Sequence, residues 1–269
     1  MGSFVHTLEF LAFSVTMLTT NDNAVLSQIF DPESAPSSGI LVDASLPPDP
    51  ILDSIALAEI KAEEKSILME VENIMREPKD SARRQDILTK AYSNLETLID
   101  QFPNSAALLN DHAQIFRLLH GDNVIISYEV SPLSSDVISK ASKALSGLNQ
   151  AIRILSPPTP QAGVSPTQCR TLAQAHTQRG ALYHAASKAL TTRPSNKGVP
   201  EVVISSLRHW KALDFEEAAS RDFFMGGRYG NEVGKALAVH TNPTAKLCGQ
   251  MVQDAMRREF APSLKSSLS

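Results

Sequence analysis

Between Ala91 and Phe116 the chain reads AYSNLETLIDQFPNSAALLNDHAQIF, and this stretch decides the fold class. Apolar residues recur every three or four positions before Pro103 and again after it, a spacing that predicts two amphipathic helices in series. Pro103 ends the first helix, because proline cannot continue the helical hydrogen-bond ladder. Small residues such as Ala91 and Ala113 let neighbouring helices approach closely, and larger ones such as Leu95 fill the gaps.

The same helical spacing extends beyond this stretch. Residues 51–77 carry apolar residues at helical intervals, and Pro78 ends that run. The alternation typical of strands is nearly absent, and the one β-branched cluster, Val124–Ile126, is expected in a loop. The sequence therefore predicts an all-α protein.

Helices in series indicate an internal repeat, and the order of small and large residues matches the tetratricopeptide pattern. Ala91 and Ala144 are 53 residues apart and Ala144 and Ala219 are 75 apart, against about 34 in the ideal repeat. The excess falls in segments rich in Pro, Ser or Thr, which predicts loop insertions at 123–136, 157–166 and 191–200. The alternative is an unrelated helical bundle with accidental matches. The matching residues are Ala91, Leu95, Leu98, Pro103, Leu109, Ala113, Phe116, Ala144, Leu148, Ala151, His176, Gly180, Tyr183, Ala219, Phe223 and Gly226.

We therefore expect a helical solenoid of three helix-hairpin repeats with capping helices. An N-terminal extension (1–20) precedes a short helix and a Pro- and Ser-rich linker (21–50), and the repeat domain spans 51–256. Within that domain the expected repeats are 51–103, 104–157 and 167–230, followed by a C-terminal cap at 231–258 and a disordered tail at 259–269.

Composition excludes several classes of function. The 269 residues carry a net charge of −4 and are 6% aromatic, which argues against binding to nucleic acid or to an anionic membrane. Two cysteines are too few for a disulfide framework or a cysteine-rich zinc site. The apolar run Leu8–Leu18 is too short to cross a bilayer and lacks a basic leader, so a cytosolic tail is favoured over a targeting signal. We expect a cytoplasmic protein, with the nucleus as a second location.

Five segments, taken together and in order, carry a resemblance to a known family: Asn21–Pro32, Ser105–Gln114, Thr177–Gly180, Ala219–Phe223 and Asn242–Met251. They resemble the tetratricopeptide repeat protein 36 family, and the chain is similar to a divergent, fungal-type member. Thr244 stands where that family usually has Tyr, and the loop insertions are extra. The resemblance implies three repeats, no catalysis and a protein-binding adaptor role, and it implies two partners, a Hsp70-type chaperone and an enzyme of tyrosine catabolism.

The sequence holds no convincing catalytic, cofactor or metal site. His176 and His184 are eight residues apart with no carboxylate between them, which is a poor spacing for a metal. Asp111 and His112 are adjacent on a helix and point about 100° apart, so they pair badly as a catalytic dyad. The glycine-rich run at 226–230 lies at a helix end and is expected to stop the helix. We expect a non-enzymatic protein without cofactors.

The family geometry places polar side chains of the first helix of each repeat in a groove, which could hydrogen-bond a peptide. Lys and Arg would be needed there to clamp a terminal carboxylate, but Gln174 and Gln178 occupy those positions unless the register shifts and recruits Arg179. The candidate groove residues are Asn110, Asp111, Gln114, Arg117, Gln174, Thr177, Gln178 and His184.

Two functions therefore remain open, and a third is disfavoured. The first is a co-chaperone-like adaptor that binds a protein segment in the groove. The alternative is a stabilising partner of a metabolic enzyme, which would use the outer surface and the long loops. The third, an unrecognised enzyme, lacks a polar constellation to support it.

Overall fold

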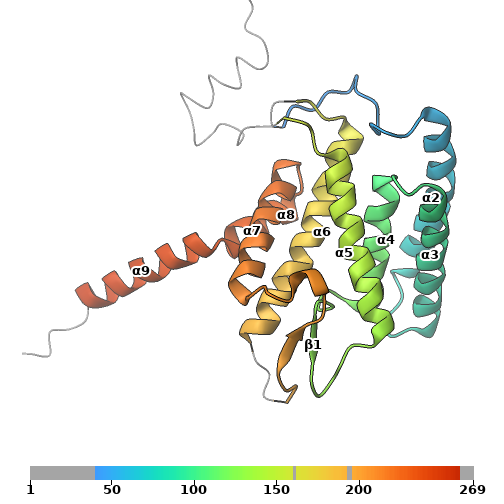
Figure 1. The fold of residues 1–269 in the computed structure, drawn as a ribbon. Coiled ribbons are helices and arrows are strands. Elements are labelled where there is room, and N and C mark those ends of the chain that lie inside the picture. Colours follow the sequence, from blue (N-terminus) through green and yellow to red (C-terminus); the bar gives the residue numbers. More distant parts are fainter. Residues whose placement is uncertain (1–39, 160–161, 193–195, 261–269) are drawn as a thin grey trace, which may run out of the picture. The chain divides into compact units, whose positions relative to one another are not determined.

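The computed structural model describes residues 40–159, 162–192 and 196–260, and within them the chain is a series of helices (Figure 1). The expected N-terminal extension, the helix within 21–30 and the last nine residues lie outside the described residues. Consecutive helices pack against each other in pairs, so the all-α prediction is confirmed. The helices are α2 Ser54–Ile74, α3 Ala82–Gln101, α4 Ala106–His120, α5 Ser135–Leu155, α6 Pro166–Thr191, α7 Ala212–Arg228, α8 Glu232–Thr241 and α9 Pro243–Phe260.

Serine side chains start four of these helices. Ser81, Ser105, Ser134 and Ser165 each accept a hydrogen bond from a backbone N–H in the first turn of the helix that follows. At α6 the cap is reciprocal, because the Gln168 side chain accepts from the Ser165 N–H at 2.7 Å. These caps satisfy N–H groups that would otherwise lack a partner, and they fix where each helix begins.

The core runs between the paired helices. Phe116 of α4 and Leu148 of α5 are fully buried, as are Phe215 and Phe223 of α7. Gly180 of α6 lies directly against Phe223, and a Cβ added to this glycine would come within 3.0 Å of the ring. The small residue therefore sets how closely α6 and α7 approach.

One loop expectation is wrong. The β-branched cluster expected in a loop leads into a short strand, β1 Ile126–Tyr128, which pairs antiparallel with β2 Pro200–Val202 (Figure 1). The register places Ile126 opposite Val202. Val124, Ile125 and Ile126 are each at most 2% exposed, so burial of their side chains favours extended backbone here.

The end of the expected linker is fixed to the helical domain. Val42 lies beside Val164, and the Asp43 N–H donates to the Val164 carbonyl at 2.9 Å. The Val164 N–H donates in turn to the Leu41 carbonyl. Residues 40–50 therefore run along the start of α6 rather than acting as a free linker.

The C-terminal helices differ in how they pack. Gly227 of α7 lies so close to Lys235 of α8 that an added Cβ would stand 2.8 Å from the Lys235 Cα. By contrast, α9 extends away from the other helices (Figure 1) and leaves Leu247, Met251 and Met256 exposed. The helix continues through Phe260, so the first two residues of the expected tail are helical. In the part of the chain that the structure describes, no helix has the length and apolar character needed to cross a membrane.

Candidate functional site

Amide side chains of α4 and α6 hold these two helices together. Asn110 is 1% exposed, and its Nδ2 donates to Gln174 Oε1 at 3.1 Å. Gln178 Nε2 donates in return to Asn110 Oδ1 at 2.8 Å and to the Asn110 carbonyl at 3.3 Å. The structure thus brings three predicted groove residues together, and their hydrogen bonds form an internal link between α4 and α6.

The Gln178 side chain has one polar atom, Oε1, that takes no part in the link to Asn110. Both of its bonds to Asn110 use Nε2, which fixes the orientation of the amide and leaves Oε1 without a hydrogen-bond partner in the described part of the chain. The residue is only 6% exposed. A buried acceptor without a donor destabilises by about 1–3 kcal/mol, so this oxygen favours an incoming N–H group.

Five of the eight predicted residues line one cleft of about 450 Å³. They are Gln114, Arg117, Gln174, Thr177 and Gln178. The cleft also contains residues that the sequence analysis did not select, because they lie in the turns between helices and at a helix start. These include Lys79, Asp122 and Asn231.

The cations of this cleft are held differently. Arg117 Nε donates to Asp122 Oδ1 at 2.6 Å, so the guanidinium is fixed at the turn after α4. Lys79 lies exposed in the turn between α2 and α3. Asn231 caps α8 by accepting from the Gly234 N–H. The cleft therefore combines one fixed cation, one exposed cation and several amides, a lining suited to hydrogen bonding with a peptide.

Asp111 belongs to a pair of acids rather than to the cleft. Burial raises the pKa of Asp111 to about 7, and the nearby carboxylate of Glu64 on α2 raises it further. Burial likewise raises the pKa of Glu64. Asn110 Nδ2 donates to Asp111 Oδ1 at 3.2 Å, which connects the pair to the amides of α4 and α6. The two acids are 47 positions apart, and no local pattern connects them in the sequence.

The remaining predicted groove residue, His184, is in a structural position. His184 lies outside the cleft, with its ring edge toward Phe223 at 6.2 Å between centroids. Asp111 and His112 do not pair, because the His112 ring packs against Tyr92 of α3, with the two rings tilted by 33°. The expectation that the two form no catalytic dyad agrees with this geometry.

A buried ionic cluster joins α6 to α7. Asp222 accepts from Arg179 at 2.6 and 2.7 Å and lies 2.8 Å from His176 Nδ1. Burial opposes the charge of Asp222, but the bonds from Arg179 and His176 outweigh it and hold the pKa of this carboxyl below its usual value. Arg179 also donates to Asn149. Arg179 is thus engaged between helices, which removes the register alternative that would recruit it for a carboxylate clamp.

The described polar residues form no group of three or more metal-ligating side chains that could hold an ion. The clusters described above each connect neighbouring helices. The protein is therefore of the helical class in which consecutive helices pack in pairs, and it has a polar cleft between the α4–α5 pair and the α6–α7 pair.

Comparison with known proteins identifies the family. The chain is 38% identical over 253 residues to the L-tyrosine degradation gene cluster protein hmgX of Aspergillus fumigatus, an alignment that covers 90% of this chain and 93% of that protein. It is 25% identical over 238 residues to the tetratricopeptide repeat protein 36 homolog of Drosophila pseudoobscura pseudoobscura, covering 88% and 94% of the two chains. No model of a known protein family matches, and neither does any solved structure. The chain belongs to the family of hmgX and tetratricopeptide repeat protein 36, as its sequence motifs predicted.

Proposed function

We propose that this chain is a non-enzymatic, protein-binding helical repeat protein that stabilises an enzyme of L-tyrosine degradation. The observation that carries the proposal is the match along nearly the whole chain to hmgX, whose name places it in an L-tyrosine degradation gene cluster. Such a match preserves the order of the helices, and not just a single motif. A stabilising partner needs an extended surface and no catalytic centre. The polar clusters of this chain fit that role, because each of them connects one helix to another.

We propose that the fold is a solenoid of three tetratricopeptide repeats. The three hairpins would be α2–α3, α4–α5 and α6–α7. Consecutive packing of these helices supports it, as does the small residue at the α6–α7 contact, where Gly180 meets Phe223. The similarity to the Drosophila tetratricopeptide repeat protein 36 homolog supports it further. In this arrangement α4 and α6 line the groove, while α3 and α5 form the outer surface.

We place the contact with the enzyme on the outer surface and on the β1–β2 ribbon. In the groove, Asn110 and Gln178 are buried and bonded to each other, so that Gln178 Oε1 is the polar side-chain atom of this pair left to bond a partner. The ribbon, in contrast, presents Glu129 and Glu201 to solvent. This position matches the alternative hypothesis that uses the outer surface and the long loops.

The test uses the purified full chain and each enzyme of L-tyrosine degradation in turn. We expect one of these enzymes to bind the chain in calorimetry and to keep its activity longer at 37 °C when the chain is present. The enzyme's own turnover number should stay the same, because the chain adds stability and no catalytic group. If no enzyme of the pathway binds or gains lifetime, the proposal is wrong.

Two matched double variants separate the surfaces. Glu129→Lys with Glu201→Lys reverses charge on the ribbon, and Lys79→Glu with Gln114→Glu changes the cleft; all four side chains are exposed. We expect the ribbon variant to weaken enzyme binding and the cleft variant to leave it unchanged. The reverse result would favour the second candidate function, a peptide-binding adaptor, which the unpartnered Gln178 Oε1 supports.

A further inference from the structure

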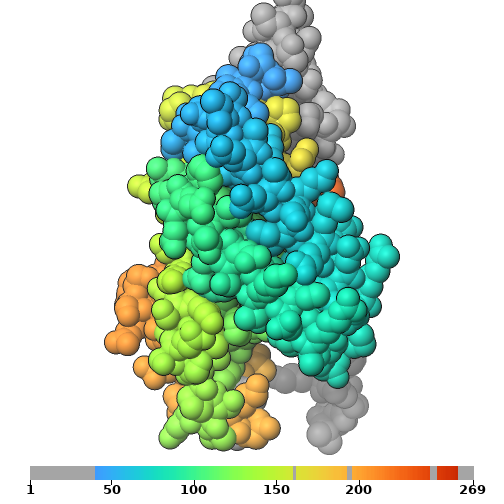
Figure 2. All heavy atoms as spheres, turned by 90° about the vertical axis from the view of Figure 1, so that its right-hand side faces the viewer, coloured from blue at the N-terminus to red at the C-terminus, as the bar shows by residue number. Residues whose placement is uncertain are grey.

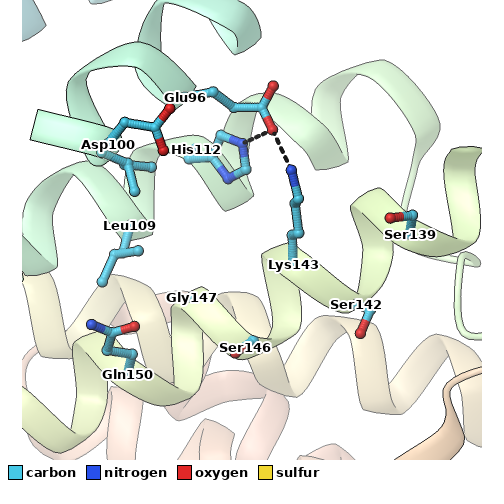
Figure 3. A pocket seen from close by; sticks show the side chains of 11 residues that line it. Glu96, Asp100, Leu109, His112, Ser139, Ser142, Lys143, Ser146, Gly147 and Gln150 are labelled. Carbon is cyan, nitrogen blue, oxygen red and sulfur yellow. Dashed lines mark hydrogen bonds and ion pairs between the residues drawn. The ribbon is translucent and has the colours of Figure 1, made fainter. Parts of the chain in front are cut away.

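A second hollow lies between α3, α4 and α5, apart from the cleft described above. It measures about 600 Å³, a size typical of ligand sites, and it shares no lining residue with that cleft (Figure 3). Figure 2 looks onto α2 and α3, with α5 beside them. The hollow is built from the helices that form the outer surface in the proposed solenoid, together with one face of α4.

His112 lines this hollow and has an unsatisfied ring nitrogen. Its side chain is 6% exposed, and its ring packs at a tilt against Tyr92, with 4.2 Å between centroids. Nε2 has no hydrogen-bond partner among the described residues. Burial lowers the pKa of His112 to about 4, so the ring is neutral at physiological pH. A neutral ring nitrogen that carries no proton is a hydrogen-bond acceptor.

A carboxylate lies next to this nitrogen. Glu96 Oε1 stands 3.9 Å from His112 Nε2, too far for a hydrogen bond, and 3.1 Å from Lys143 Nζ (Figure 3). Asp100 lies one turn further along α3 and lines the same hollow. The acids outnumber the single lysine, and the Lys143 side chain is 64% exposed. An exposed lysine loses little when it turns back into water, so it can give way to a better-placed cation.

The walls of the hollow suit a long side chain with a charged, planar end. Ile99 and Leu109 supply apolar surface for a methylene stem, and the nitrogen and the carboxylates lie beside it. A guanidinium carries several N–H donors in a fixed plane and can donate to two acceptors at once. An ammonium presents a compact charge without this geometry, and a carboxylate would be repelled by Glu96 and Asp100.

We propose that this hollow binds an arginine side chain of the partner protein, whose guanidinium donates to His112 Nε2 and to the carboxylates of Glu96 and Asp100. The inference rests on the proposed function for the source of the arginine, which is the bound enzyme. It requires the His112 tautomer with its proton on Nδ1, so that Nε2 accepts. Lys143 then acts as a competitor that occupies Glu96 while the site is empty.

The test is a nitrogen NMR titration of the full chain labelled at histidine. The probe is N-acetyl-arginine amide, and N-acetyl-citrulline amide is the neutral control of nearly the same shape. We expect the arginine probe to shift the Nε2 resonance of His112 in a saturable way and the citrulline probe to bind at least about tenfold more weakly, because a charge-assisted bond is the stronger. Equal binding of both probes, or no shift of His112 with the arginine probe, would overturn the inference.

Charge variants give opposite expected effects. Glu96→Gln should weaken the arginine probe about tenfold, and Asp100→Asn, an exposed position that leaves packing unchanged, should weaken it several-fold. Asp86→Asn removes a charge elsewhere on α3 and should have no effect, which separates the site from general attraction. Lys143→Gln removes the competitor and should tighten binding several-fold, whereas Lys90→Gln on α3 should not. An equal effect of a site variant and its control would contradict the proposal.

The outcomes also separate this inference from the proposed function. Saturable arginine binding without any bound enzyme of L-tyrosine degradation would leave the site in place and refute the proposed function. Conversely, an enzyme that binds equally well to Glu96→Gln and to the unchanged chain would leave the function in place and refute this site.

Discussion

The acid pair between α2 and α4 predicts an unusual dependence of stability on pH, and Asp111→Asn tests it. The amide can still accept from Asn110 and can donate to Glu64, so it reproduces the protonated form of Asp111 at every pH. In the unchanged chain, the pKa of Asp111 rises from its usual value of 3.8 to about 7 on folding, because the carboxyl is buried next to Glu64. The folded state therefore holds a proton that the unfolded state has released.

The sign follows from that difference in proton binding. Below about pH 4, Asp111 is protonated in both states and its stabilising effect is fully present. Between pH 4 and 7 the unfolded state alone ionises, so stability falls as pH rises, and above pH 7 the loss is complete. Between pH 5 and pH 7 the free energy of unfolding can change by at most about 1.4 kcal/mol for each of the two pH units. We expect about 2 kcal/mol, since relaxation around the pair lowers this bound.

Urea unfolding followed by circular dichroism at pH 5, 6, 7 and 8.5 measures the effect. The free energy of unfolding of Asp111→Asn should exceed that of the unchanged chain by a margin that grows up to pH 7 and then levels off. His112 and His120, whose pKa values are lowered by burial, act in the opposite direction, but they are present in both proteins and cancel in the difference. Asp86→Asn, an exposed control on α3, should show no such trend. A margin that does not change with pH would refute the reasoning.

Three further substitutions probe the contacts between helices. Gly226→Ala should lower the free energy of unfolding, measured in urea, by about 2 kcal/mol, because the new Cβ would stand 2.5 Å from the Thr177 hydroxyl on α6. Gly249→Ala is the control; it has open space around it and should not destabilise. Asp222→Ala should lower the free energy of unfolding by about 3 kcal/mol, because Arg179, whose side chain is only 19% exposed, would lose its carboxylate partner. An unchanged melting temperature would contradict this. Ser165→Ala should cost about 1 kcal/mol by removing the α6 cap, and native-state hydrogen exchange should show faster exchange in the first turn of α6 alone.

Local sequence patterns predicted the helices well because their signals lie within a few residues of each other. Helical spacing and prolines such as Pro103 act at short range, so the end of α3 just before Pro103 follows from the sequence. The motif resemblance gave the family. Facing positions on α4 and α6, such as Asn110 and Gln178, also follow from the repeat geometry, although their contact with each other does not.

Contacts between distant residues could not be predicted in this way. Glu64 and Asp111 meet only because α2 lies beside α4. Likewise, His112 of α4 and Glu96 of α3 come close only because these two helices pack against each other. The β1–β2 pairing joins residues far apart in the sequence: Ile126 lies opposite Val202, 76 positions further along the chain. A single strand without its partner has no pattern that separates it from a loop.

The β1–β2 ribbon has a consequence for how such chains diverge. The two strands lie in separate connections, one between α4 and α5 and the other between α6 and α7, and they pair with each other along one edge. Loss of either connection alone would leave a bare strand edge with buried residues such as Ile126 newly exposed, a template for aggregation. Relatives of this chain should therefore keep both of these long connections or have neither, so that two loops remote in the sequence are gained or lost together in evolution.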